Sequence, residues 1–444
     1  MIRQVFTWVF SVVLRIFFRR IELAGIERVP KDGPVIFVLN HPNALIDPAF
    51  MLCLSPRPVS FLGKSTLWSI PVVGTITRAF DSIPVYRKQD GGGDNSKTFR
   101  LCRELLSRGG SLALFPEGIS HNAPHLQPMK TGAARIGLGA QLDRLLIVPA
   151  GLYYNAKGIF RSDALVYFGE PIEAARVEMA SDGEPPRDAV RALTDQIGQS
   201  LAEVTLQAER AEALGMVERV EKILAATDGD DEDPTLFESF EVQQRLIEGY
   251  YALKARDPAP VEALERRVTR YERDLERLGL DSDHLSPDQF TWWGSIRYAL
   301  SSFLALALML PVAAVGAVVH GPAYQVTRVM ALRLYKGDND MLGTLKILLA
   351  LVLYPITWVL AGVGCWWATG LWWAGVVGAL VAPLSAWVAL RFLEYFGEVM
   401  GAARGLALFL TRRRLFGRLH DERVAIRAQI VALSQKFEAQ DAAP

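Results

Sequence analysis

A histidine and an aspartate stand close together near the start of this sequence, directly after a short apolar run. His41 and Asp47 lie within Asn40–Pro48, and the preceding run Val35–Leu39 predicts a buried strand. A neutral imidazole can take a proton from a hydroxyl group, and a nearby carboxylate can orient the ring and stabilise its cation. Asp47 also has a structural interpretation, because aspartate followed by proline is a favourable helix start.

An arginine and a glutamate follow at the ends of two further apolar runs. Arg87 closes the stretch Asp81–Arg87, and its planar guanidinium suits bidentate binding of a phosphate. Glu117 follows the predicted strand Ser111–Phe115, so we expect it at the carboxyl edge of a sheet, where ligands of open α/β sheets gather. The plainer alternatives are a surface arginine and a glutamate that caps a turn.

A metal site is not expected in this region. Glu117, His121 and His125 recur at steps of four residues, a spacing that would suit metal ligands on one face of a helix. The prolines and the glycine within Pro116–Pro124 argue against a helix there.

The elements that must position these residues alternate between strands and helices from about residue 21 to residue 172. Short apolar runs are separated by helix-like segments such as Lys97–Ser107 and Thr131–Leu142. This alternation predicts an α/β domain with a largely buried sheet. The expected strands are Val35–Leu39, Ser111–Phe115, Leu145–Val148 and Ala164–Phe168.

The rest of the chain predicts helices and a membrane region. The first residues are apolar with scattered arginines and favour a helix lying in the membrane interface, with a true span as the alternative. The expected divisions are an interfacial helix at 1–20, the α/β domain at 21–186, a helical region with an acidic linker at 187–290, membrane-embedded helices at 295–390 and a basic amphipathic tail at 391–444.

Two uncharged apolar stretches carry the membrane prediction. Tyr298–Tyr324 is long enough for one span but contains Pro311, and Ile347–Leu390 is long enough for two spans joined near Cys365–Gly370. Basic residues flank these stretches and the N-terminal helix, which favours a multi-pass membrane protein whose α/β domain faces the cytoplasm. To keep all basic flanks on one side, we expect the first stretch to enter and return, or to pack at the interface.

The composition gives no support for a nucleic-acid partner, a disulfide framework or a zinc site. The 444 residues carry no net charge, which gives no argument for a nucleic-acid partner, and the mean hydropathy of +0.18 is high for a soluble protein. The three cysteines are far apart, so neither a disulfide framework nor a zinc site is expected.

Four blocks taken in order resemble the glycerolipid acyltransferase family, whose members share a PlsC-like domain. They are His41–Asp47, Ile83–Arg87, Phe115–Gly118 and Ile147–Pro149. Five residues rather than the commoner four separate His41 from Asp47, and Ile119–His121 replaces the usual Thr-Arg-Ser. These departures, and the block Gly337–Lys346, look similar to the fungal-type glycerol-3-phosphate/dihydroxyacetone-phosphate acyltransferases.

The resemblance implies a membrane-bound enzyme of phospholipid synthesis. It would move a fatty acyl group from acyl-CoA or acyl-carrier protein to glycerol-3-phosphate or dihydroxyacetone phosphate, with no cofactor. His41 would be the general base and Asp47 its partner. The residues expected to bind the acceptor are Arg87 for the phosphate, Glu117 and Gly118 for the glycerol, with Ser120 and Lys130 as further candidates.

Three alternatives stay open from the sequence. A 1-acyl-glycerol-3-phosphate acyltransferase uses the same blocks on a monoacylated acceptor. An inactive lipid-binding membrane scaffold would not need an intact set of site residues. A transporter would be expected to carry acidic or basic side chains within its spans, and the two apolar stretches have none.

Overall fold

The computed structural model describes residues 2–86, 94–181, 183–225, 234–280, 292–335 and 341–441. These residues form two compact units. The first unit comprises Met1–Glu209 together with Leu236–Phe240 and Leu334–Ile347, and the second comprises Arg210–Thr235, Glu241–Arg333 and Leu348–Pro444. Two short segments from the C-terminal half of the chain therefore belong to the first unit.

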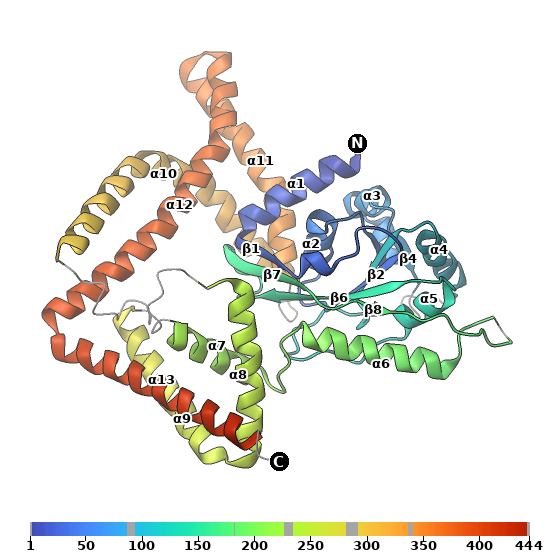
Figure 1. Ribbon diagram of the computed structural model, residues 1–444. Helices are drawn as coiled ribbons and strands as arrows, with labels where there is room; N and C mark the ends of the chain where they lie inside the picture. Colours follow the sequence, from blue (N-terminus) through green and yellow to red (C-terminus); the bar gives the residue numbers. More distant parts are fainter. Residues whose placement is uncertain are drawn as a thin grey trace. The chain divides into compact units, whose positions relative to one another are not determined.

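An eight-stranded sheet forms the centre of the first unit (Figure 1), in the order β1-β7-β6-β2-β5-β3-β4 with β8 beside β6. Pairing is parallel except for β6 with β7 and β6 with β8. The expected α/β class is therefore confirmed. The strands are β1 Phe18–Ala24, β2 Val35–Leu39, β3 Ser60–Lys64, β4 Ile83–Val85, β5 Ser111–Leu114, β6 Leu146–Tyr154, β7 Ser162–Phe168 and β8 Ile172–Glu173.

Helices cover both faces of this sheet, which explains why the central strand β2 is apolar throughout and fully buried. Ile36 and Val38 pack into a core that also holds buried residues of α4, α5 and α6. Phe37 points to the opposite face, where the centroid of its ring lies 6.2 Å from that of Phe168. The helices of this unit are α1 Ile2–Phe17, α2 Ile46–Leu54, α3 Pro71–Ala79, α4 Ser96–Ser107, α5 Gly132–Gly139 and α6 Arg187–Glu203, with short 3-10 turns at Ile26–Arg28 and Ser65–Ser69.

The second unit is built from helices, which run from α7 to α13 along the described part of the chain. Val268, Tyr271 and Leu275 of α9 pack in one core with buried residues of α7 and α13. Arg267 of α9 also donates to both carboxylate oxygens of Glu422 on α13, at 2.6 and 3.0 Å. The helices are α7 Ala211–Ala225, α8 Leu236–Arg256, α9 Pro258–Leu278, α10 Trp292–Leu334, α11 Leu342–Thr369, α12 Trp372–Thr411 and α13 Arg413–Asp441.

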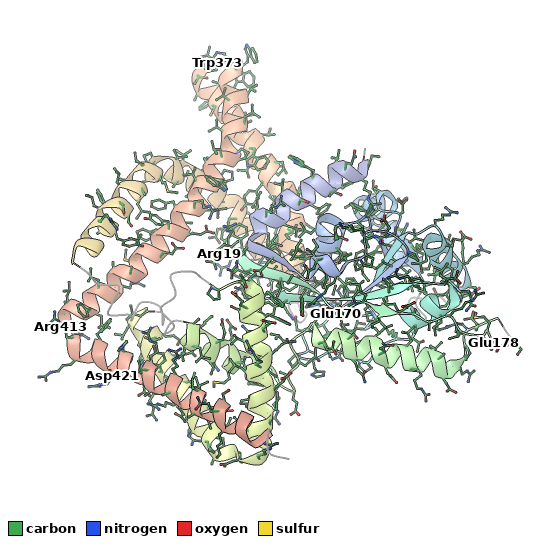
Figure 2. All side chains as sticks on the ribbon, viewed as in Figure 1. Arg19, Glu170, Glu178, Trp373, Arg413 and Asp421 are labelled. Atoms are coloured by element: carbon green, nitrogen blue, oxygen red, sulfur yellow. The ribbon has the colours of Figure 1, made fainter. Side chains whose placement is uncertain are left out.

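Three of these helices, α10, α11 and α12, are long and apolar enough to cross a membrane. The joint expected near Cys365–Gly370 is confirmed, because α11 ends at Thr369 and α12 begins at Trp372. Figure 2 shows Trp373 at the far end of this helical hairpin. The four tryptophans at this end are all more than half exposed, which suits an aromatic belt at a membrane surface.

The break expected at Pro311 is wrong. Helix α10 runs from Trp292 to Leu334 through Pro311 and Pro322, and the entry and return of this stretch stays a prediction. A proline removes one backbone hydrogen bond, but ending the helix in apolar surroundings would leave more backbone groups unpaired. His320 within α10 is buried and accepts a hydrogen bond from Nε1 of Trp358 on α11 at 3.1 Å.

Candidate active site

The site lies where parallel strands of the sheet end. Strand β2 ends at Leu39, two residues before His41, and its neighbour β5 ends at Leu114, three residues before Glu117. Because β2 and β5 are parallel, their carboxyl ends deliver both loops to the same edge. The loop Asn40–Leu45, which contains His41, is called the histidine loop here. Its start is fixed by Asn40, whose side-chain amide pairs with the backbone of Leu152 at 3.0 and 2.7 Å.

His41 and Asp47 form a direct pair. Nδ1 of His41 lies 2.8 Å from Oδ2 of Asp47, whose side chain is completely buried. The imidazole stacks on the ring of Phe115 at 3.8 Å with 6° between the planes. One ring nitrogen is therefore held by a carboxylate and the plane of the ring is fixed. The side chain of His41 is still 16% exposed, so a substrate can reach the ring.

Asp47 accepts hydrogen bonds from two further donors. The backbone N–H of Asn43 donates to Oδ2 at 2.7 Å, and the phenol of Tyr154 donates to Oδ1 at 2.7 Å. Burial, together with the negative charge of Asp47, raises the pKa of Tyr154 well above its usual value, so the phenol keeps its proton. Asp47 is the second residue of α2, whose cap position is Leu45, so its carboxylate serves the histidine loop.

Glu117 is buried and ties the histidine loop to the loop after β5. Its Oε1 accepts the backbone N–H of His41 at 3.1 Å, and its Oε2 accepts the N–H of Gln127 at 2.7 Å and Nε2 of His121 at 2.5 Å. The N–H of His121 in turn donates to the carbonyl of His41 at 3.1 Å. Glu117 thus holds the backbone N–H of His41 directly through Oε1, and through Oε2 it binds His121, whose N–H holds the carbonyl of His41.

The remaining candidates of this loop lie beside the pair. Gly118 has a φ of +74°, and a side chain there would collide with the ammonium group of Lys130. The backbone N–H of Lys130 donates to the carbonyl of Pro116 at 2.8 Å, which brings that lysine back to the turn. The hydroxyl of Ser120 accepts the N–H of Ala44 at 3.1 Å. The structure therefore brings together every candidate site residue except Arg87, which lies outside the described residues.

No pattern in the sequence pointed to Tyr154. This residue is the last of β6, 107 positions after Asp47, and the parallel pairing of β2 with β6 brings its hydroxyl to the carboxylate.

Within the described residues, no group of three or more histidine, cysteine or acidic side chains is placed to hold a metal ion.

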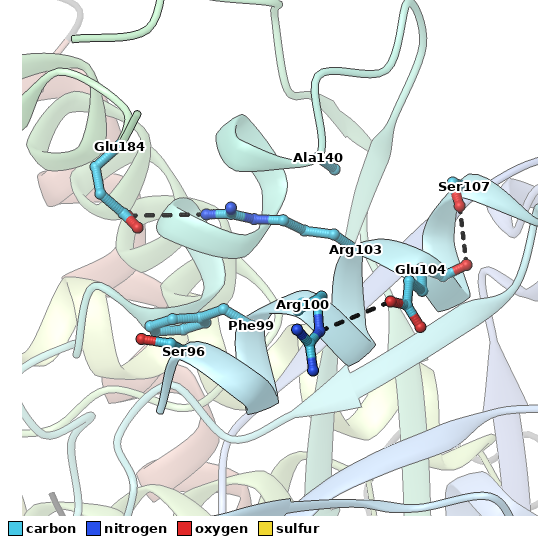
Figure 3. A pocket seen from close by; sticks show the side chains of 8 residues that line it. All are labelled: Ser96, Phe99, Arg100, Arg103, Glu104, Ser107, Ala140 and Glu184. Carbon is cyan, nitrogen blue, oxygen red and sulfur yellow. Dashed lines mark hydrogen bonds and ion pairs between the residues drawn. The ribbon is translucent and has the colours of Figure 1, made fainter. Parts of the chain in front are cut away.

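A pocket of about 450 Å³ lies elsewhere on the first unit and shares no residue with this site (Figure 3). Two ion pairs run along its wall, Arg103 with Glu184 at 3.8 Å and Arg100 with Glu104 at 3.9 Å. Its arginines are therefore matched by carboxylates, which gives no reason to assign it an anionic ligand.

Comparison with known proteins gives two matching families. The sequence model of the Acyltransferase family matches residues 20–153, and that of the Glycerol-3-phosphate acyltransferase 2 C-terminal domain matches residues 228–440. The first range contains His41, Asp47 and Glu117, and the second contains α8 to α13 apart from the last residue of α13.

Related proteins are known from yeasts. An uncharacterized acyltransferase of Schizosaccharomyces pombe is 24% identical over 97% of this chain and 80% of its own length. Glycerol-3-phosphate O-acyltransferase 2 of Saccharomyces cerevisiae is 29% identical over 60% of this chain and 37% of its own length. Glycerol-3-phosphate O-acyltransferase 1 of the same yeast is 23% identical over 80% of this chain and 60% of its own length.

Among solved structures, the crystal structure of 1-acyl-sn-glycerophosphate acyltransferase from Thermotoga maritima matches with a TM-score of 0.33 and 18% identity, over 44% of this chain and 75% of that chain. The chain therefore joins a region that matches the Acyltransferase family to a region that matches the Glycerol-3-phosphate acyltransferase 2 C-terminal domain, and its yeast homologues include two glycerol-3-phosphate O-acyltransferases, of whose length it spans 37% and 60%.

Proposed function

We propose that this protein transfers a fatty acyl group from a thioester, acyl-CoA or acyl-carrier protein, to a hydroxyl of glycerol-3-phosphate or dihydroxyacetone phosphate. The observation that carries the proposal is the contact of 2.8 Å between His41 and the fully buried Asp47, in a chain homologous to yeast glycerol-3-phosphate acyltransferases. The pair supplies a base that is already oriented, and the homology supplies the acceptor.

His41 would act as the general base. With Nδ1 bonded to Asp47, the neutral ring carries its proton on Nδ1, and Nε2 is left to accept the proton of the acceptor hydroxyl. The acceptor oxygen then attacks the thioester carbonyl, the C–S bond breaks as the C–O ester bond is completed, and the imidazolium returns the proton to the departing thiolate. Asp47 stabilises the imidazolium between these two proton transfers.

The acceptor would be bound by the residues around Gly118. Arg87 is assigned to the phosphate because its guanidinium can bind two oxygens at once. Ser120 and Lys130 are assigned to the polar end of the same acceptor, since both lie beside the turn that contains Gly118. Glu117 would contribute by holding the backbone of His41, because its oxygens already accept three protein donors.

The second candidate acceptor is 1-acyl-glycerol-3-phosphate. Plant 1-acyl-sn-glycerol-3-phosphate acyltransferases match this chain at 27% and 29% identity, over 37% and 32% of its length. The glycerol-3-phosphate acyltransferases match over 60% and 80% of the chain, and the matched C-terminal domain is named for them. This difference favours the unacylated acceptor.

A membrane location is proposed together with the activity, with the catalytic unit facing the cytoplasm. Helix α1 supports it, because large apolar side chains on one of its faces are exposed while Leu14 and Phe17 are buried against the first unit. At ~1.5 Å per residue the helix is ~24 Å long, shorter than the ~30 Å core of a bilayer, which suits a position in the membrane plane. The exposed residues are Ile2, Val5, Trp8, Val12 and Ile16.

The test uses purified protein in detergent or lipid with radiolabelled acyl-CoA or acyl-carrier protein as the donor and, in separate reactions, three acceptors. We expect glycerol-3-phosphate or dihydroxyacetone phosphate to yield a labelled monoacyl product at least about tenfold faster, in kcat/KM, than 1-acyl-glycerol-3-phosphate yields a diacyl product. Faster transfer to the monoacyl acceptor would replace the proposed acceptor with the second candidate. Transfer to none of the three from either donor would overturn the proposal.

A further inference from the structure

The first residues of α11 belong to the catalytic unit, although they follow His41 by about three hundred positions. Leu334–Ile347 is assigned to the first unit, and within it Thr344 is only 3% exposed. Its hydroxyl accepts the backbone N–H of Leu45 at 3.2 Å. Leu45 lies between His41 and Asp47, so a side chain from the C-terminal domain bonds directly to the loop that joins the catalytic pair.

Two neighbours of Thr344 hold the same segment in place. A Cβ atom at Gly343 would lie 2.9 Å from Cδ1 of Ile46 and 3.3 Å from Oδ1 of Asn43, so the backbone of α11 touches the loop directly. Lys346 donates through Nζ to the carbonyl of Gly158 at 2.6 Å. The segment is therefore fixed to the catalytic unit on both sides of Thr344.

The loop needs such support because its backbone is strained. Ala44 has a φ of +36°, in the left-handed region that residues with a side chain rarely adopt. Strain of this kind persists only where the surrounding contacts leave the chain no other conformation. Here the N–H of Ala44 is taken by Ser120 and the next N–H, of Leu45, by Thr344. The strained residue is thus held by side chains from two distant parts of the sequence.

The loop conformation in turn sets the catalytic pair. The N–H of Asn43 donates to Asp47 at 2.7 Å, and the N–H of Ile46 donates to the carbonyl of Asn43 at 2.9 Å. If Ala44 and Leu45 relaxed, Asn43 would move with them, and the carboxylate that it helps to fix would lose one of its donors. A shift of this kind changes the distance between Asp47 and the ring of His41.

We propose that Thr344 is a positioning residue for acyl transfer, and that the start of α11 completes the active site by fixing the loop between His41 and Asp47. The inference rests on the proposed function for the acyl-transfer reaction and for the roles of His41 and Asp47. Thr344 bonds to the loop that joins His41 to Asp47, so its effect is expected in the rate of the chemical step.

The test compares Thr344→Val with Thr344→Ser in the full-length purified enzyme. Valine keeps the shape but removes the acceptor oxygen, and leaves the partly buried N–H of Leu45 without its partner, so we expect kcat to fall at least about fivefold. The KM values for acyl-CoA and for the phosphorylated acceptor should stay within about twofold, because no substrate contact is lost. Serine keeps the oxygen and should restore kcat to within about twofold of the unchanged enzyme.

Thr357→Val is the matched control, since Thr357 lies on the same helix and its hydroxyl bonds only to the carbonyl of Leu353 at 2.9 Å among the described residues. It should leave kcat unchanged. Gly343→Ala is the second route to the same prediction if Thr344→Val folds poorly, because the added methyl group presses on Ile46 while Thr344 is retained. It should lower kcat in the same way.

Three results would overturn the inference: an unchanged kcat in Thr344→Val, a loss that Thr344→Ser does not restore, or an equal loss in Thr357→Val. If the enzyme prefers another acceptor, the proposed function fails, but the ratio of kcat values between the variants on that acceptor still tests Thr344. The two proposals are therefore judged separately.

Discussion

Replacement of Asp47 by asparagine separates catalysis from helix capping. Asparagine caps a helix nearly as well as aspartate, so a carboxylate with only that role would be replaced at little cost. In the structure the carboxylate is fully buried and accepts donors from His41, Asn43 and Tyr154. An amide oxygen in place of Oδ2 can still accept the first two, and the phenol of Tyr154 can turn to accept from the amide N–H₂. The fold is therefore expected to survive.

The charge is what this variant removes. A hydrogen bond to a charged partner is worth about 1.5–3 kcal/mol, and the pair needs this stabilisation when the ring of His41 becomes a cation. At ~1.36 kcal/mol for each factor of ten, we expect Asp47→Asn to lower kcat about 10- to 150-fold. The KM for either substrate should change little, because the carboxylate is fully buried behind His41, Asn43 and Tyr154.

The assay is steady-state transfer of labelled acyl groups, with thermal unfolding measured on the same preparations. Asp163→Asn is the matched control, since Asp163 is also buried and its carboxylate pairs with Arg19 at 3.0 Å. That variant should lose stability and keep its kcat. If Asp47→Asn retains more than about half of the activity, then Asp47 does not stabilise a histidine cation and the mechanism fails at this step.

Four further predictions concern other residues of the site and the α11–α12 hairpin. Tyr154→Phe should lower kcat about tenfold without changing KM, because Asp47 loses a charge-assisted hydrogen bond; an unchanged kcat would remove Tyr154 from the mechanism. Glu117→Gln should lower both activity and melting temperature, since one amide oxygen cannot accept all three donors, and a fully active, equally stable variant would contradict this. Arg87→Ala should raise the KM for the phosphorylated acceptor about tenfold or more and that for acyl-CoA less than about twofold, whereas the reverse pattern would place Arg87 at the donor. In protein whose other native cysteines are serine, a membrane-impermeant maleimide applied to intact cells should label Cys365, at the exposed end of the α11–α12 hairpin, but not a cysteine introduced at Ala442. Labelling of both positions or of neither would contradict a two-span hairpin.

The sequence predicted those parts of the site that follow directly from a strand. His41 and Glu117 each come a few residues after a fully buried apolar run, and parallel pairing of two such runs is enough to bring their loops together. The hairpin joint at Cys365–Gly370 was also visible, because two apolar stretches of span length flank it. Local composition and period decide such features.

Contacts between distant segments left no local signal. Tyr154 and Thr344 are 107 and 299 positions from the residues they bond in the histidine loop, so their roles depend on the tertiary fold. At Pro311 the local sequence predicted the wrong structure. Proline usually interrupts a helix, but apolar surroundings favour a continuous helix, and α10 runs through this residue.

The most direct test of the account is the rate of acyl transfer by the purified His41→Ala enzyme, measured beside the unchanged protein with labelled acyl-CoA and saturating glycerol-3-phosphate. A positioned base contributes about 10²- to 10⁴-fold, so we expect kcat to fall by at least about a hundredfold. The melting temperature should stay close to that of the unchanged protein, since the imidazole is partly exposed and its removal leaves the bonds to Glu117 in place. A folded His41→Ala enzyme that transfers acyl groups at near the original rate would contradict the central claim.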